Sequence, residues 1–142
     1  MPIRRHLLPK VMLPDTSIRN VDIIGDGKVD GFQFKLRNPW YTAQPTSSIV
    51  DFVITVDGKK FDPEKITLII RGQKIPLTKA STMWEISWRF PELIDVFVEK
   101  PGGLEIGDHE LTCDIAMRET IDYGYPNSRI SFPVKKIMKV TK

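Results

Sequence analysis

The stretch Phe32-Gln33-Phe34-Lys35-Leu36-Arg37 alternates apolar and polar side chains residue by residue. Successive side chains of a β-strand point to opposite faces, so a period of two predicts a strand with one buried and one solvated face. The preceding run Ile18–Ile24 is also apolar, and Gly25-Asp26-Gly27 between the two runs is a turn signal. The two runs are therefore predicted to form a β-hairpin.

Further β-rich runs follow at short, regular spacing. They cover residues 50–56, 66–70, 84–90, 96–98, 111–117 and 130–134, and an extension of the last run to residue 140 stays open. Asp57-Gly58 and Pro101-Gly102-Gly103 are turn signals between these runs, and Pro91–Ile94 is expected to form one helical turn. No stretch has a sustained helical period. We therefore predict an all-β chain, a single-domain antiparallel β-sandwich or jelly-roll with about eight or nine strands.

Residues 1–17 precede this pattern and are interrupted by prolines. We expect an N-terminal arm, extended or loosely paired as a strand, and a sandwich domain over residues 18–142. The chain starts with a basic segment, as a signal peptide does, but Pro9 and Lys10 interrupt the apolar run that a signal peptide needs. A cytoplasmic location is the resulting expectation.

The composition excludes several classes of protein. The 142 residues are 41% hydrophobic and 27% charged, which is ordinary for one globular domain. No window approaches the roughly 18 apolar residues of a membrane helix. The net charge of +3, from 21 basic and 18 acidic residues, is too small and too scattered to indicate nucleic-acid binding. Cys113 is the only cysteine, which excludes an intramolecular disulfide.

Catalytic and metal-binding groups are sparse. A zinc site needs about three or four converging ligands, and the chain has one thiol and only two histidines, His6 and His109. His109 follows Gly107 and begins a strand, where an outward polar residue is expected. Cys113 lies on the apolar side of its strand and is expected to be buried. No metal site is predicted in this chain.

Two segments are rich in acidic residues. The turn that begins at Asp26 suggests a calcium loop, but Lys28 stands at its third position and Arg37 at its twelfth, where calcium loops need oxygen ligands. Glu119 and Asp122 are the best acidic candidates for catalysis, and solvated loop edges are the favoured interpretation of both. No catalytic residue is predicted.

The connection from Arg37 to Ser48 differs from the other turns. It holds Pro39 and Pro45, which fix the backbone, and the adjacent aromatic residues Trp40 and Tyr41. It is predicted to be a shaped loop that presents a function.

A second aromatic loop contains Tyr123 and Tyr125 beside Gly124 and Pro126. Two interpretations of the aromatic residues on both loops stay open: a cap folded over one end of the sandwich, or an exposed edge for a partner or ligand. Other aromatic residues alternate along strands and are expected in the core: Phe32, Phe34, Phe52, Trp84, Trp88 and Phe132.

The order of these motifs resembles the small (beta) subunit of bacterial C-glycoside deglycosidases. The similarity spans roughly residues 18–125, and each motif alone is weak. The motifs are Gly31-Phe32-Gln33-Phe34-Lys35-Leu36-Arg37, Pro39-Trp40-Tyr41 with Pro45 and Ser47 or Ser48, Val56-Asp57-Gly58-Lys59, Lys100-Pro101-Gly102-Gly103-Leu104 and Gly107-Asp108-His109-Glu110-Leu111.

The resemblance implies a β-sandwich that pairs with a larger, barrel-type alpha subunit, as a heterodimer or a higher assembly. The alpha subunit is then expected to carry a divalent metal, manganese, and the acid and base residues. The complex is expected to cleave the C–C bond between a 3-oxo sugar and a flavonoid or similar aglycone. The 3-oxo group acidifies the neighbouring C–H and permits elimination.

Within the Arg37–Ser48 loop, Arg37, Pro39, Tyr41 and Pro45 match the family's pattern, and Trp40 stands where tyrosine would fit equally. The resemblance implies a subunit interface or active-site edge formed by Arg37, Asn38, Pro39, Trp40, Tyr41, Gln44 and Pro45. This loop is expected to dock near the mouth of the partner's barrel. Arg37 is expected to pair there with a carboxylate.

Two other functions remain open from the sequence. One is a stand-alone carbohydrate-binding sandwich that stacks sugars on Trp40, Tyr41, Tyr123 and Tyr125. The other is a purely structural domain of a larger assembly.

Overall fold

A computed structural model describes residues 7–39, 43–118 and 129–141 of the chain. Most of these residues form strands, joined by turns and short 3-10 helices. The elements are α1 (Leu8–Met12), β1 (Ser17–Val21), β2 (Gly31–Arg37), β3 (Gln44–Pro45), η2 (Thr46–Ser48), β4 (Ile49–Val56), β5 (Lys59–Lys60), η3 (Pro63–Lys65), β6 (Ile66–Ile70), β7 (Gln73–Pro76), η4 (Leu77–Thr82), β8 (Ser87–Trp88), β9 (Leu93–Glu99), β10 (Gly107–Arg118) and β11 (Arg129–Val140).

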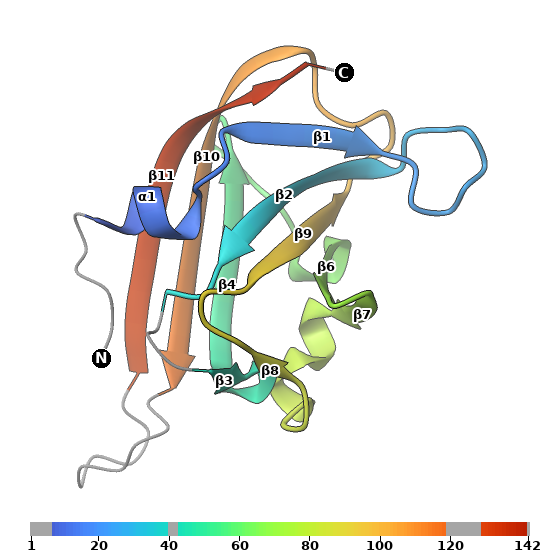
Figure 1. Cartoon of the computed structure of the whole chain (residues 1–142). Helices are drawn as coiled ribbons and strands as arrows, with labels where there is room; N and C mark the ends of the chain where they lie inside the picture. Colours follow the sequence, from blue (N-terminus) through green and yellow to red (C-terminus); the bar gives the residue numbers. More distant parts are fainter. Residues whose placement is uncertain (1–6, 40–42, 119–128, 142) are drawn as a thin grey trace, which may run out of the picture.

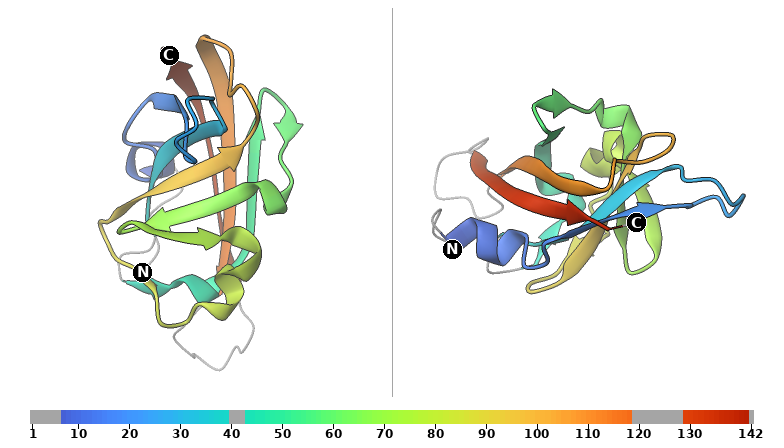
Figure 2. Two further views of the ribbon diagram at one scale, coloured as in Figure 1. Left: turned by 90° about the vertical axis from the view of Figure 1, so that its right-hand side faces the viewer. Right: turned by 90° about the horizontal axis from the view of Figure 1, so that it is seen from above.

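Within the described residues, nine strands form one curled sheet in the order β5-β4-β10-β11-β1-β2-β9-β6-β7. In Figure 1, β4, β10 and β11 run along the length of the molecule, and β1, β2 and β9 cross them obliquely. Figure 2 (left) shows β9, β6 and β7, in yellow and yellow-green, passing in front of β4 and β10. The core lies between these two layers, so the predicted all-β, sandwich-like fold is confirmed.

One strand pair differs from the prediction of a wholly antiparallel sheet. β1 runs antiparallel to β2 but parallel to β11, with Ser17 opposite Lys139 and Ile18 opposite Val140. β1 thereby joins the two antiparallel layers along one side, which makes the sheet mixed. The turn chemistry, in contrast, agrees with the sequence: Asp57 and Gly58 have φ of 51° and 82° and connect β4 to β5.

The alternating patterns correspond to buried faces. Phe32, Phe34 and Leu36 of β2 are buried, and so are Leu111 and its alternate neighbours in β10, including Cys113. Burial, followed by the negative charge of Asp114, raises the pKa of Cys113, so this thiol stays protonated and structural. The predicted hairpin between the first two strands is confirmed by the antiparallel pairing of β1 and β2.

The N-terminal segment is not the extended arm that its prolines suggested, at least from residue 8 onward. Leu8–Met12 is a short α-helix with a proline in its first turn, where the missing N–H costs nothing. Leu8 and Met12 are four residues apart and share one helix face, and both are fully buried together with Leu13. The helix lies beside β11 (Figure 1).

The predicted strand over residues 84–90 is mostly wrong. Only Ser87 and Trp88 form a strand there, β8, which pairs with β3. Trp88 is fully buried as expected, but Trp84 lies in a turn with 73% of its surface exposed. The helical turn expected at Pro91–Ile94 is also absent, because β9 already begins at Leu93. In the described part of the chain, no helix is long and apolar enough to span a membrane.

Candidate functional site

The two aromatic loops predicted from the sequence have their anchoring residues at one end of the molecule. β10 ends at Arg118, opposite Arg129 of β11, and Met117 faces Ile49, which follows Ser48 directly. The end of the first loop and both flanks of the second therefore lie at the end that carries β3 and β8, at the bottom of Figure 1. We call this region, formed by β3, η2, η4 and β8, the β3–β8 end. Trp40, Tyr41, Tyr123 and Tyr125, as well as Glu119 and Asp122, lie outside the described residues.

The buried polar side chains mark the same stretch. In the described part of the chain, four polar residues are buried, and all lie between Arg37 and Ser48: Asn38, Gln44, Thr46 and Ser48. Burying an amide or hydroxyl group is costly unless hydrogen bonds replace its contacts with water. Such bonds hold the backbone on both sides of Trp40 and Tyr41 in place.

Asn38 fixes the start of the stretch against the segment around β8. Its side-chain Nδ2 donates a hydrogen bond to the Trp88 carbonyl at 2.8 Å. Its backbone N–H donates to the Glu92 carbonyl at 3.4 Å, and the indole Nε1 of Trp88 donates to that carbonyl at 3.1 Å. The beginning of the loop is thus tied to residues some fifty positions later in the chain.

An ion pair holds the segment that Asn38 contacts. Arg71, in the turn between β6 and β7, donates from Nη1 to both carboxylate oxygens of Glu92 at 2.6 Å. Its Nη2 donates to the Ser87 carbonyl at 2.8 Å, and the Glu92 carboxylate also accepts the Arg89 N–H at 2.9 Å. Charge-assisted hydrogen bonds are stronger than neutral ones, so these bonds hold the backbone of residues 87–92 in one conformation.

Thr46 fixes the other side of the stretch. Its hydroxyl donates to the Met83 carbonyl at 2.6 Å, and its N–H donates to the Ile86 carbonyl at 2.9 Å. The Ser48 hydroxyl donates to the Pro45 carbonyl at 2.7 Å, which closes η2. The stretch and the segment 83–92 therefore form one hydrogen-bonded unit.

The remaining predicted site residues have partners or packing within this chain. Arg37 is half-buried, and its Nε and Nη1 donate to the carbonyls of Pro91 and Val11 at 3.2 and 3.4 Å. Pro39 and Gln44 are buried and Pro45 is half-buried, so these residues support the loop. That Arg37 pairs with a carboxylate of another subunit stays a prediction.

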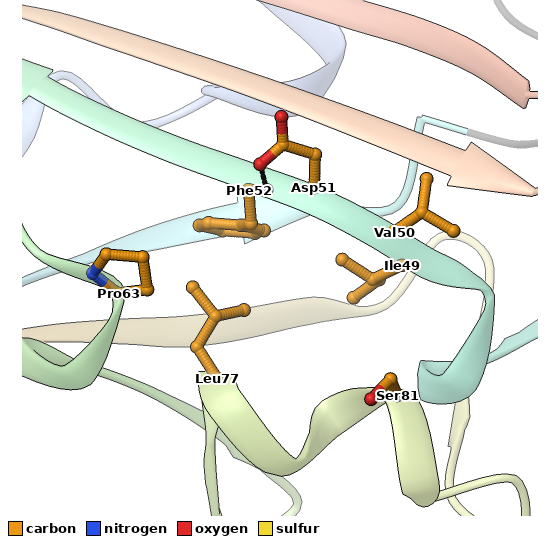
Figure 3. A pocket seen from close by; sticks show the side chains of 7 residues that line it. All are labelled: Ile49, Val50, Asp51, Phe52, Pro63, Leu77 and Ser81. Atoms are coloured by element: carbon orange, nitrogen blue, oxygen red, sulfur yellow. Dashed lines mark hydrogen bonds between the residues drawn. The ribbon is translucent and has the colours of Figure 1, made fainter.

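A pocket of about 230 Å³ lies beside the β3–β8 end, between β4 and η4. Figure 3 shows Ile49 and Phe52 of β4 facing Pro63 and Leu77 across it. Asp51, whose carboxylate accepts the Phe52 N–H at 2.9 Å, is the one ionisable residue among those that line it. Five of the seven lining residues are apolar, and Asp51 is exposed, so the lining holds no buried titratable group of the kind that acid–base catalysis uses.

His109 lies at the opposite end of β4 and β10. Its Nδ1 contacts Asp57 Oδ2 and its Nε2 contacts the Glu105 carbonyl, both at 2.6 Å. Both partners are acceptors, so the ring donates twice and is favoured as imidazolium. Burial opposes the charge, but the Glu105 carbonyl and the Asp57 carboxylate outweigh it and raise the pKa of His109 above its usual 6.5. With neither nitrogen free, His109 works as a clamp between loops.

This clamp predicts a pH-dependent stability. The hydrogen bond from the Glu110 N–H and, to a smaller extent, the one from His109 lower the pKa of Asp57 below its usual 3.8. Because the pKa of His109 is raised, its protonated ring stabilises the fold fully below pH 6.5, and this stabilisation is lost as the pH rises through the pKa of the folded state. Because the pKa of Asp57 is lowered, its contribution is lost as the pH falls through that pKa. In the variant His109→Gln, the free energy of unfolding should fall by about 1 kcal/mol, mostly between about pH 4 and 6.5. The loss is small because Asp57 is half-exposed and solvent screens the pair.

Urea unfolding of both proteins from pH 4 to pH 9 measures this difference. In Asp57→Asn, the NMR titration of His109 should move down toward its ordinary pKa. A constant stability gap between wild type and His109→Gln over the whole range argues against the clamp.

The acidic loop between β1 and β2 has a structural explanation. Carboxylate oxygens of Asp22, Asp26 and Asp30 lie within 4.8 Å of one another. Asp22 accepts the N–H groups of Gly25, Asp26 and Gly27, and Asp30 accepts that of Ile24. Through these hydrogen bonds, the carboxylates of Asp22 and Asp30 shape the turn.

Comparison with known proteins places the chain among deglycosidase subunits. Residues 8–121 match the model of a family described as C-glycoside deglycosidase beta subunit. The chain is 35% identical over 89 residues to the 3'-dehydrocarminate deglycosidase beta subunit of Microbacterium sp, a match that covers 62% of this chain and 66% of that protein. It is 30% identical over 104 residues to the C-glycoside deglycosidase beta subunit of Eubacterium cellulosolvens, covering 73% and 70%. The matches span about two thirds of the length of these relatives.

Proposed function

Because the chain belongs to the C-glycoside deglycosidase beta subunit family, we propose that it is the non-catalytic beta subunit of a heteromeric C-glycoside deglycosidase, and that it supports and completes the active site of an alpha subunit. The family match includes the whole stretch Arg37–Ser48. The observation that carries the proposal furthest is that this stretch holds all the buried polar side chains of the described residues. Flanks that are braced by hydrogen bonds suit a permanent contact, because they lose little ordering entropy on binding.

The chemistry in this proposal belongs to the partner. The alpha subunit is a larger, barrel-type protein that holds a divalent metal, manganese, together with the acid and base groups. The substrate is a 3-oxo-C-glycoside such as an oxidised flavonoid C-glucoside, and the reaction is a carbon–carbon bond cleavage by a lyase. The ketone acidifies the adjacent C–H, whose removal permits elimination of the aglycone. The name of the Microbacterium relative, 3'-dehydrocarminate deglycosidase, agrees with a sugar oxidised at that position.

The beta subunit contributes contact surface near this chemistry. Active sites of barrel enzymes lie at the mouth of the barrel, and the β3–β8 end is proposed to dock there. Trp40 and Tyr41 supply large amphipathic side chains to the contact. In the described residues, the one histidine has both ring nitrogens engaged, and the one cysteine is buried, which supports a non-catalytic role.

Expression alone and together with the alpha subunit tests the proposal. The chain should form a stable complex of the two proteins on size-exclusion chromatography, and its yield as soluble protein should rise on co-expression. A chain that stays monomeric beside the alpha subunit and binds immobilised sugars on its own would instead identify a stand-alone carbohydrate-binding module. A chain that does neither would leave only a structural role elsewhere.

A further inference from the structure

Trp84 is an unusual surface residue in this chain. Seven large apolar side chains are exposed in the described part of the chain, and Trp84, at 73% exposure, is the one aromatic residue among them. An indole ring offers about 150–250 Å² of surface, and tryptophan is enriched among residues that dominate the energy of interfaces. A ring left so exposed in a folded domain is a candidate anchor for a partner.

The backbone around Trp84 is held on both sides by one buried residue. Thr46 binds the Met83 carbonyl with its hydroxyl at 2.6 Å and the Ile86 carbonyl with its N–H at 2.9 Å. The Met83 N–H in turn donates to the Ala80 carbonyl of η4 at 3.1 Å. The turn that carries Trp84 is therefore fixed before binding, which reduces the entropy lost when a partner covers the ring.

Exposed apolar side chains bracket the Arg37–Ser48 stretch. Thr46, near its end, fixes the turn of Trp84, and Arg37, at its start, lies opposite the partly exposed Leu93 in the β2–β9 register. Two other strongly exposed residues lie elsewhere: Ile24 on the loop that projects beyond β1, and Ile106 before the start of β10, away from the β3–β8 end (Figure 1). The turn that carries Trp84 is thus hydrogen-bonded directly to the stretch proposed to contact the alpha subunit.

We propose that Trp84 is an anchor of the alpha-subunit interface and fills an apolar recess on that subunit. This inference rests on the proposed function and adds a contact that no motif of the Arg37–Ser48 stretch contains. A stable interface buries about 800 Å² on each partner, several times what one indole supplies. The contact that covers Trp84 must therefore extend over neighbouring surface, and Thr46 ties its turn to the stretch proposed to contact the alpha subunit.

Binding affinity of purified chain for the alpha subunit tests this inference. Trp84→Ala should raise the Kd at least about 30-fold, the loss typical of a hot-spot residue. Ile106→Ala, which truncates a side chain with the same 73% exposure elsewhere on the surface, should leave the Kd unchanged. Both variants should unfold at the wild-type temperature, because both side chains are exposed.

The outcomes separate the two proposals. If the wild-type chain does not bind the alpha subunit, the proposed function fails. If the wild-type chain binds and Trp84→Ala binds equally well, only the anchor is overturned. If sedimentation shows that the isolated chain self-associates and that Trp84→Ala makes it monomeric, then a second copy of the chain covers Trp84, and the inference is likewise overturned.

Discussion

Replacing Trp88 with alanine is expected to lower the free energy of unfolding by about 3–5 kcal/mol. Trp88 is among the largest of the fully buried side chains and packs in the central hydrophobic cluster. Its indole also donates to the Glu92 carbonyl, which in addition receives the backbone N–H of Asn38. The variant therefore leaves a cavity and a carbonyl with one donor fewer. Urea unfolding followed by circular dichroism measures the loss.

Two variants control this expectation. Trp88→Phe retains most of the apolar volume but removes the indole donor, so its loss should be intermediate. Trp84→Ala replaces a tryptophan only four positions away but on the surface, and should change stability by no more than about 0.5 kcal/mol. Equal losses in the two alanine variants would contradict the burial that distinguishes these tryptophans.

Replacing both Trp40 and Tyr41 with alanine is expected to abolish co-purification with the alpha subunit. The flanking residues Asn38 and Thr46 are buried and hydrogen-bonded, so the loop is anchored on both sides. Truncating two adjacent aromatic residues at an interface typically costs several kcal/mol, since aromatic anchors dominate such contacts. Pull-down of a tagged alpha subunit, followed by size-exclusion chromatography, measures the loss.

A matched surface variant controls for indirect effects. Ile137→Ala removes an exposed apolar side chain from β11 and should leave co-purification intact. If the double variant forms the complex and sustains its full activity, the assignment of this loop to the interface is wrong.

The strands and turns that depend on neighbouring residues alone could be predicted from the sequence. The period of two in β2, β4 and β10 follows from one-sided burial of strands, and Asp57-Gly58 adopts the positive φ angles that its hairpin turn requires. The prolines of residues 1–17 predict an extended arm, but Pro9 lies in the first turn of a helix, where a proline is compatible with helical structure.

Alternation alone did not separate Trp84 from Trp88. Both fall on the same side of a period-two pattern, and only the pairing of β8 with β3 decides which of them is buried. That pairing brings together residues more than forty positions apart, which no local pattern specifies. The parallel contact of β1 with β11 was invisible to the sequence for the same reason.

The sequence and the structure single out the Arg37–Ser48 stretch by different features. The sequence indicated Arg37–Ser48 through its prolines and aromatic residues, and the structure distinguishes it by its buried polar groups. The braces of the stretch, Arg71 with Glu92 and Thr46 with residues 83–86, join distant segments.

The most direct test of the central claim is a titration of the purified alpha subunit with this chain, with cleavage of a 3-oxo-C-glucoside as the readout. A non-catalytic subunit that completes its partner's active site should show no cleavage alone, and should raise the activity of the alpha subunit until a fixed molar ratio is reached. Cleavage by this chain in the absence of the alpha subunit, or an alpha subunit whose activity is unchanged by saturating amounts of this chain, would contradict the account.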